Sequence, residues 1–151
     1  MSSIVSSTPK QFHYYHPINV RYSDLDTLRH VNNVAVLAYV ETARTGYYKS
    51  SGIWDGVIRE GFGMVVASVH IDYVESIQYD DTVRVGIMLR ALGNKSLRFW
   101  FQVESGEGER VFAKGEVVMV AYDLAKGRSH AVPADWRKKL AKFEENEELL
   151  A

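Results

Sequence analysis

One short stretch of the sequence holds most of the side chains that could do chemistry. Residues 21–33 read RYSDLDTLRHVNN and contain two carboxylates, one imidazole and two amides. An apolar pattern typical of a helix follows, so we expect the stretch to end at a helix N-terminus. The free N–H groups of a helix start can polarise a carbonyl, and a nearby carboxylate can activate water or attack that carbonyl. The stretch is therefore suited to transferring an acyl group to water.

Two other interpretations of this stretch stay open. Aspartate and asparagine are favoured in turns and caps for backbone hydrogen bonding alone, so these residues could simply turn the chain. Asp24, Asp26 and His30 also offer three possible metal ligands, but nothing in their spacing fixes a coordination geometry. The sequence contains no Gly-x-Ser-x-Gly elbow, Walker loop or His-Glu-x-x-His motif. We expect no metal site and no cofactor.

The apolar periodicity predicts the elements that would position this stretch. An extended segment covers roughly residues 13–21, and a helix of about 16 to 18 residues starts at residues 32–33 and stops at Gly52. Four runs between residues 61 and 124 alternate apolar with polar side chains, which predicts an antiparallel sheet with one buried face. Pro133 then opens a C-terminal amphipathic helix.

Two apolar faces follow from these spacings. The face of the long helix expected in the core consists of Leu37, Val40, Ala43, Tyr47 and Tyr48. The face of the first long strand expected in the core consists of Val65, Ala67, Val69, Ile71 and Tyr73.

The order of elements and the composition bound the fold class. A strand, a long helix, four strands and a short helix lack βαβ alternation, so we expect an α+β fold with one curved antiparallel sheet wrapped around the helix. The 151 residues suit one domain, with a loose leader over 1–12 and a frayed end over 145–151. The net charge of −1 and the lack of a long apolar run predict neither nucleic-acid nor membrane partners. The absence of cysteine excludes disulfides and thiolate nucleophiles and suits a cytoplasmic protein.

The run RYSDLDTLRHVNN, followed by YVETAR, resembles the hotdog-fold acyl-CoA thioesterases of the 4-hydroxybenzoyl-CoA thioesterase-like family. The order of elements resembles the hotdog plan over nearly the whole chain. The resemblance implies hydrolysis of an acyl-CoA or another acyl thioester, with Asp26 as the catalytic nucleophile or general base. It implies supporting or substrate-orienting roles for Tyr22, His30, Asn33 and Glu41. It implies contacts with CoA or the acyl group for Met64, Val65, Asn94, Lys95 and Ser96.

The resemblance also carries expectations about structure, and the sequence differs from the family pattern at two positions. Asp24 would shape the loop, and Glu41 has the i,i+3 spacing of an ion pair with Arg44. Arg29 stands where the family usually has glycine, and a positive φ is not expected of an arginine. Leu37 stands where an aromatic residue is usual.

Two other functions and an oligomeric state complete the expectations. A non-hydrolytic acyl-CoA or acyl-carrier binding protein would share the apolar and basic features without needing a reactive Asp26. A hotdog enoyl-thioester hydratase or dehydratase would need a catalytic histidine such as His70, whose alternation suggests an ordinary strand position. A single sheet leaves its edge strands open, and hotdog relatives join two sheets edge to edge with active sites between subunits. We therefore expect a homodimer or homotetramer.

Overall fold

The computed structural model of the protein describes residues 12–54 and 61–150. Its elements are β1 (Tyr14–Ile18), the short 3-10 helix η1 (Tyr22–Asp24), α2 (Asn33–Ser51), β2 (Phe62–Tyr73), β3 (Val83–Leu92), β4 (Ser96–Ser105), β5 (Val111–Asp123), β6 (Arg128–Ser129), α3 (Ala134–Glu144) and the 3-10 helix η2 (Glu147–Leu150). The expected order of one strand, a long helix, four strands and a short helix is confirmed.

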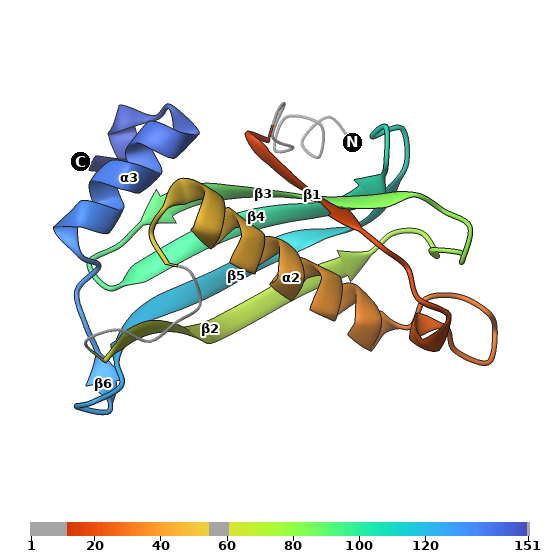
Figure 1. Ribbon diagram of the computed structural model, residues 1–151, viewed down its shortest axis with the longest axis horizontal. Helices are drawn as coiled ribbons and strands as arrows, with labels where there is room; N and C mark the ends of the chain where they lie inside the picture. Colours follow the sequence, from red (N-terminus) through yellow and green to blue (C-terminus); the bar gives the residue numbers. More distant parts are fainter. Residues whose placement is uncertain (1–11, 55–60, 151) are drawn as a thin grey trace.

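The strands form one antiparallel sheet in the order β1-β3-β4-β5-β2, with β6 paired to the end of β5 (Figure 1). The three central strands bury the apolar residues that alternate along them. Phe99 of β4 lies opposite Leu89 of β3 and Val117 of β5, and all three side chains are buried. Period-two alternation therefore identified the core face of β3 and β4 correctly. On β5 it holds from Ala113 onward, but at the start of the strand Phe112 is buried and Val111 is only partly buried.

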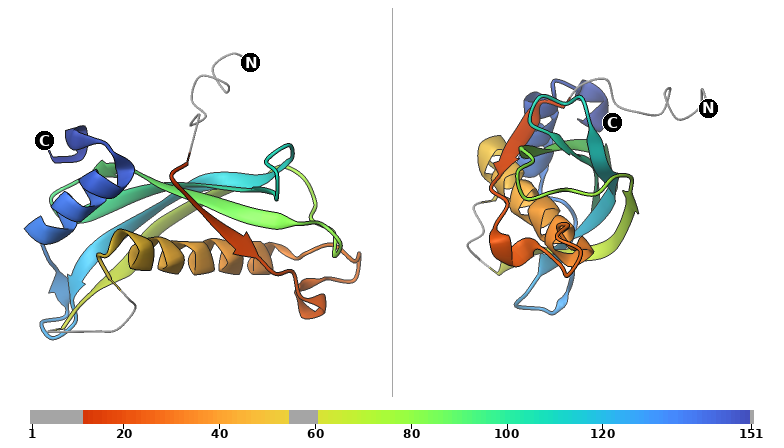
Figure 2. Two further views of the ribbon diagram at one scale, coloured as in Figure 1. Left: turned by 45° about the horizontal axis from the view of Figure 1, so that its top comes forward. Right: turned by 90° about the vertical axis from the view of Figure 1, so that its right-hand side faces the viewer.

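Helix α2 lies along the concave face of this sheet, which curls around it (Figure 2). Val40, Ala43 and Tyr47 of the helix have no exposed surface, and the Tyr47 ring meets the Phe99 ring edge-on at 5.3 Å. The helix starts where the Asn32 side chain accepts a hydrogen bond from the N–H of Ala35, and it stops at Gly52 in the left-handed conformation. Both predicted ends are confirmed.

Strand β1 crosses α2 at Gly46, and the crossing needs a glycine. A Cβ atom at this position would overlap the Tyr14 hydroxyl and lie 2.6 Å from the His16 ring. The missing side chain lets β1 approach the helix closely. This close contact with α2 therefore fixes the position of β1, the strand that leads into residues 21–33.

Helix α3 packs at the end of the sheet beside the C-terminal end of α2 (Figure 1). The apolar side expected of this helix consists of Trp136, Leu140 and Phe143; the first two are buried and Phe143 is partly buried. The segment after α3, which we expected to fray, instead forms η2, and Leu149 is only 5% exposed. At the other end of the chain, residues 1–11 of the expected leader lie outside the described residues, whereas Phe12 is buried.

The two apolar faces expected in the core are only partly buried. Strand β2 is an edge strand, and Val65, Val66 and Val69 are all more than a third exposed. Leu37 of α2 is exposed as well, at 37%. The sequence pattern identified a strand and a helix, but the register of β2 shifts between Val66 and Ser68. Val65 therefore lies opposite Val120 and Val69 opposite the buried Val117, on different faces of the sheet. Within the described residues, no helix is long and apolar enough to cross a membrane.

Candidate active site

Asp26 opens a tight hairpin loop between η1 and α2. Its backbone N–H donates to the carbonyl of His30 at 2.8 Å, and its own carbonyl accepts from the N–H of Arg29 at 3.0 Å. The carboxylate atom Oδ1 accepts hydrogen bonds from the N–H groups of Leu28 (2.9 Å) and His30 (3.2 Å). In the described part of the chain, Oδ2 has no hydrogen-bond partner. The loop therefore fixes one carboxylate oxygen and leaves the other available.

Arg29 closes this three-residue loop in the left-handed conformation, with φ of 63°. A type I turn followed by a left-handed residue is a common way to close such a loop, and glycine is the residue that adopts it without strain. The expectation that an arginine would not take a positive φ here is wrong. Arg29 is exposed, and it makes no ion pair with any described residue.

Asp24 anchors the other side of the loop and is only 4% exposed. Its Oδ2 accepts hydrogen bonds from the Tyr39 hydroxyl of α2 at 2.6 Å and from the backbone N–H of Arg21 at 3.0 Å. Burial alone would raise the pKa of Asp24, but the hydrogen bonds from Tyr39 and Arg21 outweigh it and hold that pKa below its ordinary value. Asp24 thus ties the loop to the helix, in line with the loop-shaping role expected of it.

The start of α2 is tied to both the loop and the sheet. The backbone N–H and side-chain amide of Asn32 both donate to the carbonyl of Asp24, at 2.9 and 3.0 Å. The Tyr73 hydroxyl at the end of β2 donates to the carbonyl of Asn33 at 3.1 Å. Among the described residues, nothing accepts a hydrogen bond from the backbone N–H groups of Asn33 and Val34. The helix start therefore offers free donors near the end of β2.

A cavity of about 430 Å³ borders Asp26. The Tyr22 ring meets the Tyr79 ring edge-on at 6.1 Å in its wall. The residues that line the cavity are Tyr22, Leu25, Asp26, Arg29, Gln78, Tyr79 and Asp80. Sequence reasoning placed Tyr22 beside Asp26 through the family motif, but it missed the three residues from the segment between β2 and β3. That segment shows only turn-like letters in the sequence, and its pairing with the loop is long-range.

The remaining predicted site residues fall into two groups. His30 pairs through its backbone with Gln78, next to Asp26. Glu41 is exposed two turns along α2, and its carboxylate lies 4.0 Å from the Arg44 guanidinium, which is the ion-pair spacing we expected.

The predicted substrate-contacting residues lie at the start of β2 and around the turn from β3 to β4, and these segments are at the opposite end of the sheet from η1 and the start of α2 (Figure 1). Val65 pairs with Val120 of β5, and Val120 in turn pairs with Ser96 of β4, so these three residues lie in one row. Lys95 precedes Ser96, and its Nζ atom is 3.3 Å from the Ser129 hydroxyl. Helix α2 alone spans about 28 Å between the two ends. A single chain therefore brings Met64, Val65, Asn94, Lys95 and Ser96 together, but does not bring them to Asp26.

The carboxylates of the 21–33 stretch are also possible metal ligands by residue type. Asp24 and Asp26 bind backbone and side-chain donors, as described above, and the described residues contain no group of three His, Asp or Glu side chains that could hold a metal ion.

Comparison with known proteins identifies the family. A model of the thioesterase-like superfamily matches residues 20–140, which include every site residue named above. The chain is 29% identical over 124 residues to the long-chain acyl-CoA thioesterase FadM of Escherichia coli strain K12, covering 82% of this chain and 93% of FadM. It is 30% identical over 118 residues to the uncharacterized protein YsmA of Bacillus subtilis strain 168, covering 78% of each chain.

The fold agrees with a solved relative. A Thermus thermophilus thioesterase complexed with coenzyme A and Zn superposes with a TM-score of 0.80 and 34% sequence identity, covering 91% of this chain and 98% of that one. The family model spans most of the chain, and the sheet wrapped around α2 is shared with this structure. The protein therefore belongs to the thioesterase-like superfamily and has its hotdog fold.

Proposed function

We propose that the protein is an acyl-CoA thioesterase in which Asp26 acts on the thioester carbonyl. The observation that carries this proposal is the hydrogen bonding of the Asp26 carboxylate beside a cavity. Two backbone N–H groups bind Oδ1, so the side chain has a defined orientation while Oδ2 is free of partners among the described residues. Both a nucleophile and a general base need this combination of fixed direction and unoccupied oxygen.

Two routes lead to the same products from this arrangement. As a general base, Asp26 would take a proton from water while the water oxygen attacks the carbonyl carbon, and the CoA sulfur would leave and be protonated. As a nucleophile, Oδ2 would form an acyl anhydride with release of the thiolate, and water would then hydrolyse the anhydride. In both routes negative charge develops on the carbonyl oxygen, and the free N–H groups of Asn33 and Val34 are suited to stabilise it.

We further propose that the working unit is at least a homodimer formed through β2. This strand of 12 residues is an edge of the sheet, and its outer backbone groups have no strand partner among the described residues. Exposed apolar side chains occur along it and on the adjacent start of α2: Val65, Val66, Val69, Tyr73, Val34 and Leu37. A long apolar edge of this kind favours pairing with another strand.

A two-fold axis at β2 would also complete the site. Antiparallel pairing of β2 with the β2 of a second copy sets the beginning of one strand beside the end of the other. The beginning carries Met64 and Val65, and the end carries Tyr73, which is bonded to the start of α2. Such a dimer would bring the predicted CoA- and acyl-contacting residues of one copy toward the Asp26 end of the other.

The proposed chemistry is tested by replacing Asp26 with asparagine and following CoA release with a thiol reagent, to which a protein without cysteine adds no background. The substrates are short, medium, long and aromatic acyl-CoA esters. Asp26→Asn should lower kcat by about 100-fold or more, because the amide is neither a base nor a nucleophile. Asp135→Asn is the control, since Asp135 is an exposed carboxylate on α3 that does not line this cavity, and it should keep near wild-type turnover.

Two results would contradict the proposal. If folded Asp26→Asn retains wild-type turnover, Asp26 is not the catalytic carboxylate. If the wild-type protein binds acyl-CoA esters but releases no CoA from any of them, the non-hydrolytic binding protein is the better assignment. Hydration of a trans-2-enoyl thioester would favour the hydratase. That reaction would need a catalytic histidine such as His70, which is exposed on β2 with its Nε2 atom 3.2 Å from Asp72 Oδ2.

A further inference from the structure

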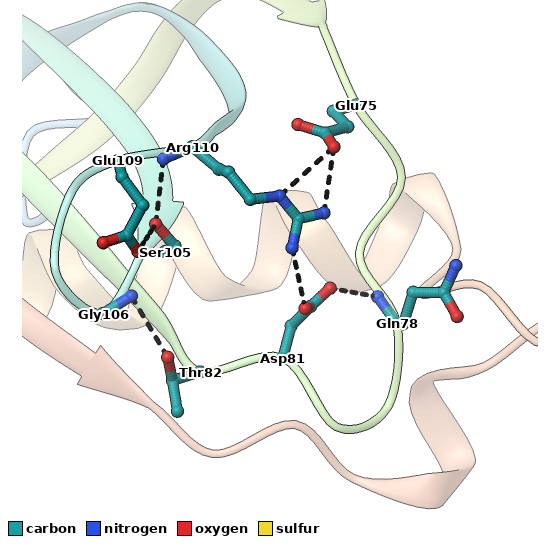
Figure 3. Close-up of polar contacts among 8 residues, drawn as sticks. All are labelled: Glu75, Gln78, Asp81, Thr82, Ser105, Gly106, Glu109 and Arg110. Atoms are coloured by element: carbon teal, nitrogen blue, oxygen red, sulfur yellow. Dashed lines mark hydrogen bonds and ion pairs between the residues drawn. The ribbon is translucent and has the colours of Figure 1, made fainter.

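Arg110 links two parts of the chain at the Asp26 end of the sheet (Figure 3). It lies just before β5, and its guanidinium is held between two carboxylates of the segment that joins β2 to β3. Its Nη2 and Nε atoms donate to Glu75 Oε1 at 2.9 and 3.2 Å, and its Nη1 atom donates to Asp81 Oδ1 at 3.0 Å. The backbone N–H of Arg110 donates to the Ser105 hydroxyl at 2.9 Å, which fixes the base of the side chain to β4.

The two carboxylates bound by Arg110 differ in what else they hold. Asp81 uses its second oxygen, Oδ2, to accept the backbone N–H of Gln78 at 2.8 Å. Among the described residues, the side chain of Glu75 bonds only to Arg110. Asp81 thus connects the guanidinium to the backbone at Gln78, and Glu75 does not.

The backbone at Gln78 is the surface against which the Asp26 loop rests. Gln78 pairs with His30 as an isolated antiparallel bridge, and the carbonyl of Ile77 accepts the N–H of Val31 at 2.9 Å. The backbone N–H of His30 in turn donates to Asp26 Oδ1, and the His30 carbonyl accepts the N–H of Asp26. The contacts therefore run from Arg110 through Asp81, Gln78 and His30 to the Asp26 carboxylate.

We propose that Arg110 is a positioning residue for Asp26, acting through Asp81 and the backbone of Gln78. The inference rests on the proposed thioesterase function, because it assigns Arg110 a role in the orientation of the carboxylate that would act on the thioester. The Arg110–Asp81 pair is partly buried, with side chains 41% and 18% exposed, so we expect its loss to affect stability as well as geometry. A displacement of about 1 Å at a reacting group can lower the rate by up to about 100-fold.

The test compares two alanine variants of the same cluster. Asp81→Ala and Glu75→Ala each remove one carboxylate from Arg110, but only Asp81→Ala also removes the side-chain acceptor of the Gln78 N–H. The backbone bond from the Asp81 N–H to the Gln78 carbonyl, at 3.1 Å, remains in both variants. Asp81→Ala and Arg110→Gln should each lower kcat on an acyl-CoA ester by roughly tenfold with KM within about twofold, and Glu75→Ala should stay near wild type. Arg110→Lys should recover part of kcat, because an ammonium can still bond to Asp81.

A control and a direct structural readout accompany the kinetics. Arg98→Gln removes a cross-strand ion pair of similar exposure, 2.5 Å from Glu116, that has no connection to the Asp26 loop, and it should leave kcat unchanged. Amide hydrogen exchange should be faster at Leu28 and His30 in Asp81→Ala and Arg110→Gln than in Glu75→Ala or Arg98→Gln.

The outcomes separate this inference from the proposed function. Equal kcat values and equal exchange rates in Asp81→Ala and Glu75→Ala would overturn the positioning role. A loss of thermal stability in Arg110→Gln with unchanged kcat and unchanged exchange at Leu28 and His30 would overturn it too. If the wild-type protein hydrolyses no thioester, the proposed function fails, and the exchange rates still decide whether Arg110 orders the loop.

Discussion

At the residue scale, the Asp26 loop combines one oriented carboxylate with one strained residue. The hairpin needs a left-handed residue at its third position, and Arg29 occupies it. A left-handed conformation costs a non-glycine residue about 1–2 kcal/mol. Glycine at this position would form the same loop without that cost.

Arg29→Gly should therefore raise the free energy of unfolding. Relief of the left-handed strain is partly offset by the greater freedom of glycine in the unfolded chain, which leaves a gain of roughly 0.5–1 kcal/mol. Urea denaturation at neutral pH measures the change. Leu28→Gly is the control, because Leu28 has a negative φ and its replacement should lower the free energy of unfolding instead. An Arg29→Gly protein less stable than wild type would contradict the claim that the backbone at Arg29 is strained.

The sequence predicted some residues of the site and not others for a physical reason. Asp26, His30 and Asn33 lie within eight residues, and local motif chemistry brings them together. The hydrogen bond between Asp24 and Tyr39 spans a loop and two helical turns, and the ion pair between Arg110 and Asp81 joins two different strand connections. Such pairings depend on the folded sheet, and no spacing in the sequence indicates them.

At the element scale, apolar alternation predicted burial well for the central strands and poorly for β2. Alternation along β3 and β4 identified their core residues, because both strands have neighbours on each side and α2 beneath them. Alternation along β2 is similar, yet Val65 and Val69 are exposed, and a register shift between Val66 and Ser68 places them on opposite faces of the sheet. The period of a strand indicates that one face is apolar, but it does not indicate that the strand lies at an edge.

The attachment of α3 to the sheet involves a buried carboxylate. Glu144 at the end of α3 is 4% exposed, and it accepts hydrogen bonds from the backbone N–H of Leu89 at 2.9 Å and from the Tyr47 hydroxyl. Burial raises the pKa of Glu144 above its ordinary value, although these hydrogen bonds and nearby His13 oppose the shift. The carboxylate is thus more easily protonated in the folded chain than in the unfolded one.

This difference in pKa predicts how stability changes with pH. The contribution of Glu144 is fully present below its unfolded pKa of about 4.3 and is lost as the pH rises through the higher folded pKa. Glu144→Gln stays neutral, so its Tm relative to wild type should increase between roughly pH 4.5 and pH 7.5. Exposed Glu148→Gln is the control, and its Tm difference from wild type should not change over this range. A Tm difference for Glu144→Gln that is flat or falls with pH would contradict the raised pKa.

At the scale of the whole molecule, the positions of the two groups of predicted site residues argue for assembly. The start of α2 and the Asp26 loop before it lie at one end of the sheet, and the start of β2 and the turn from β3 to β4 lie at the other. The β2 edge runs between these ends. Pairing of two copies across this edge would satisfy its backbone groups, bury its valines and join the two ends in each of two sites.

The double variant Val66→Lys/Val69→Lys tests this assembly. Lysines on an edge strand oppose pairing with another strand, so the variant should sediment as a monomer where the wild-type protein sediments as a dimer or larger, and its kcat/KM on an acyl-CoA ester should fall by at least roughly tenfold. Leu150→Lys is the control, since Leu150 is 50% exposed in η2, which packs against α3 and β3 and not against β2. Circular dichroism checks that the variant keeps its fold. A folded monomer with wild-type kcat/KM would show that one chain completes its own site, and the placement of the substrate at the β2 edge would then be wrong.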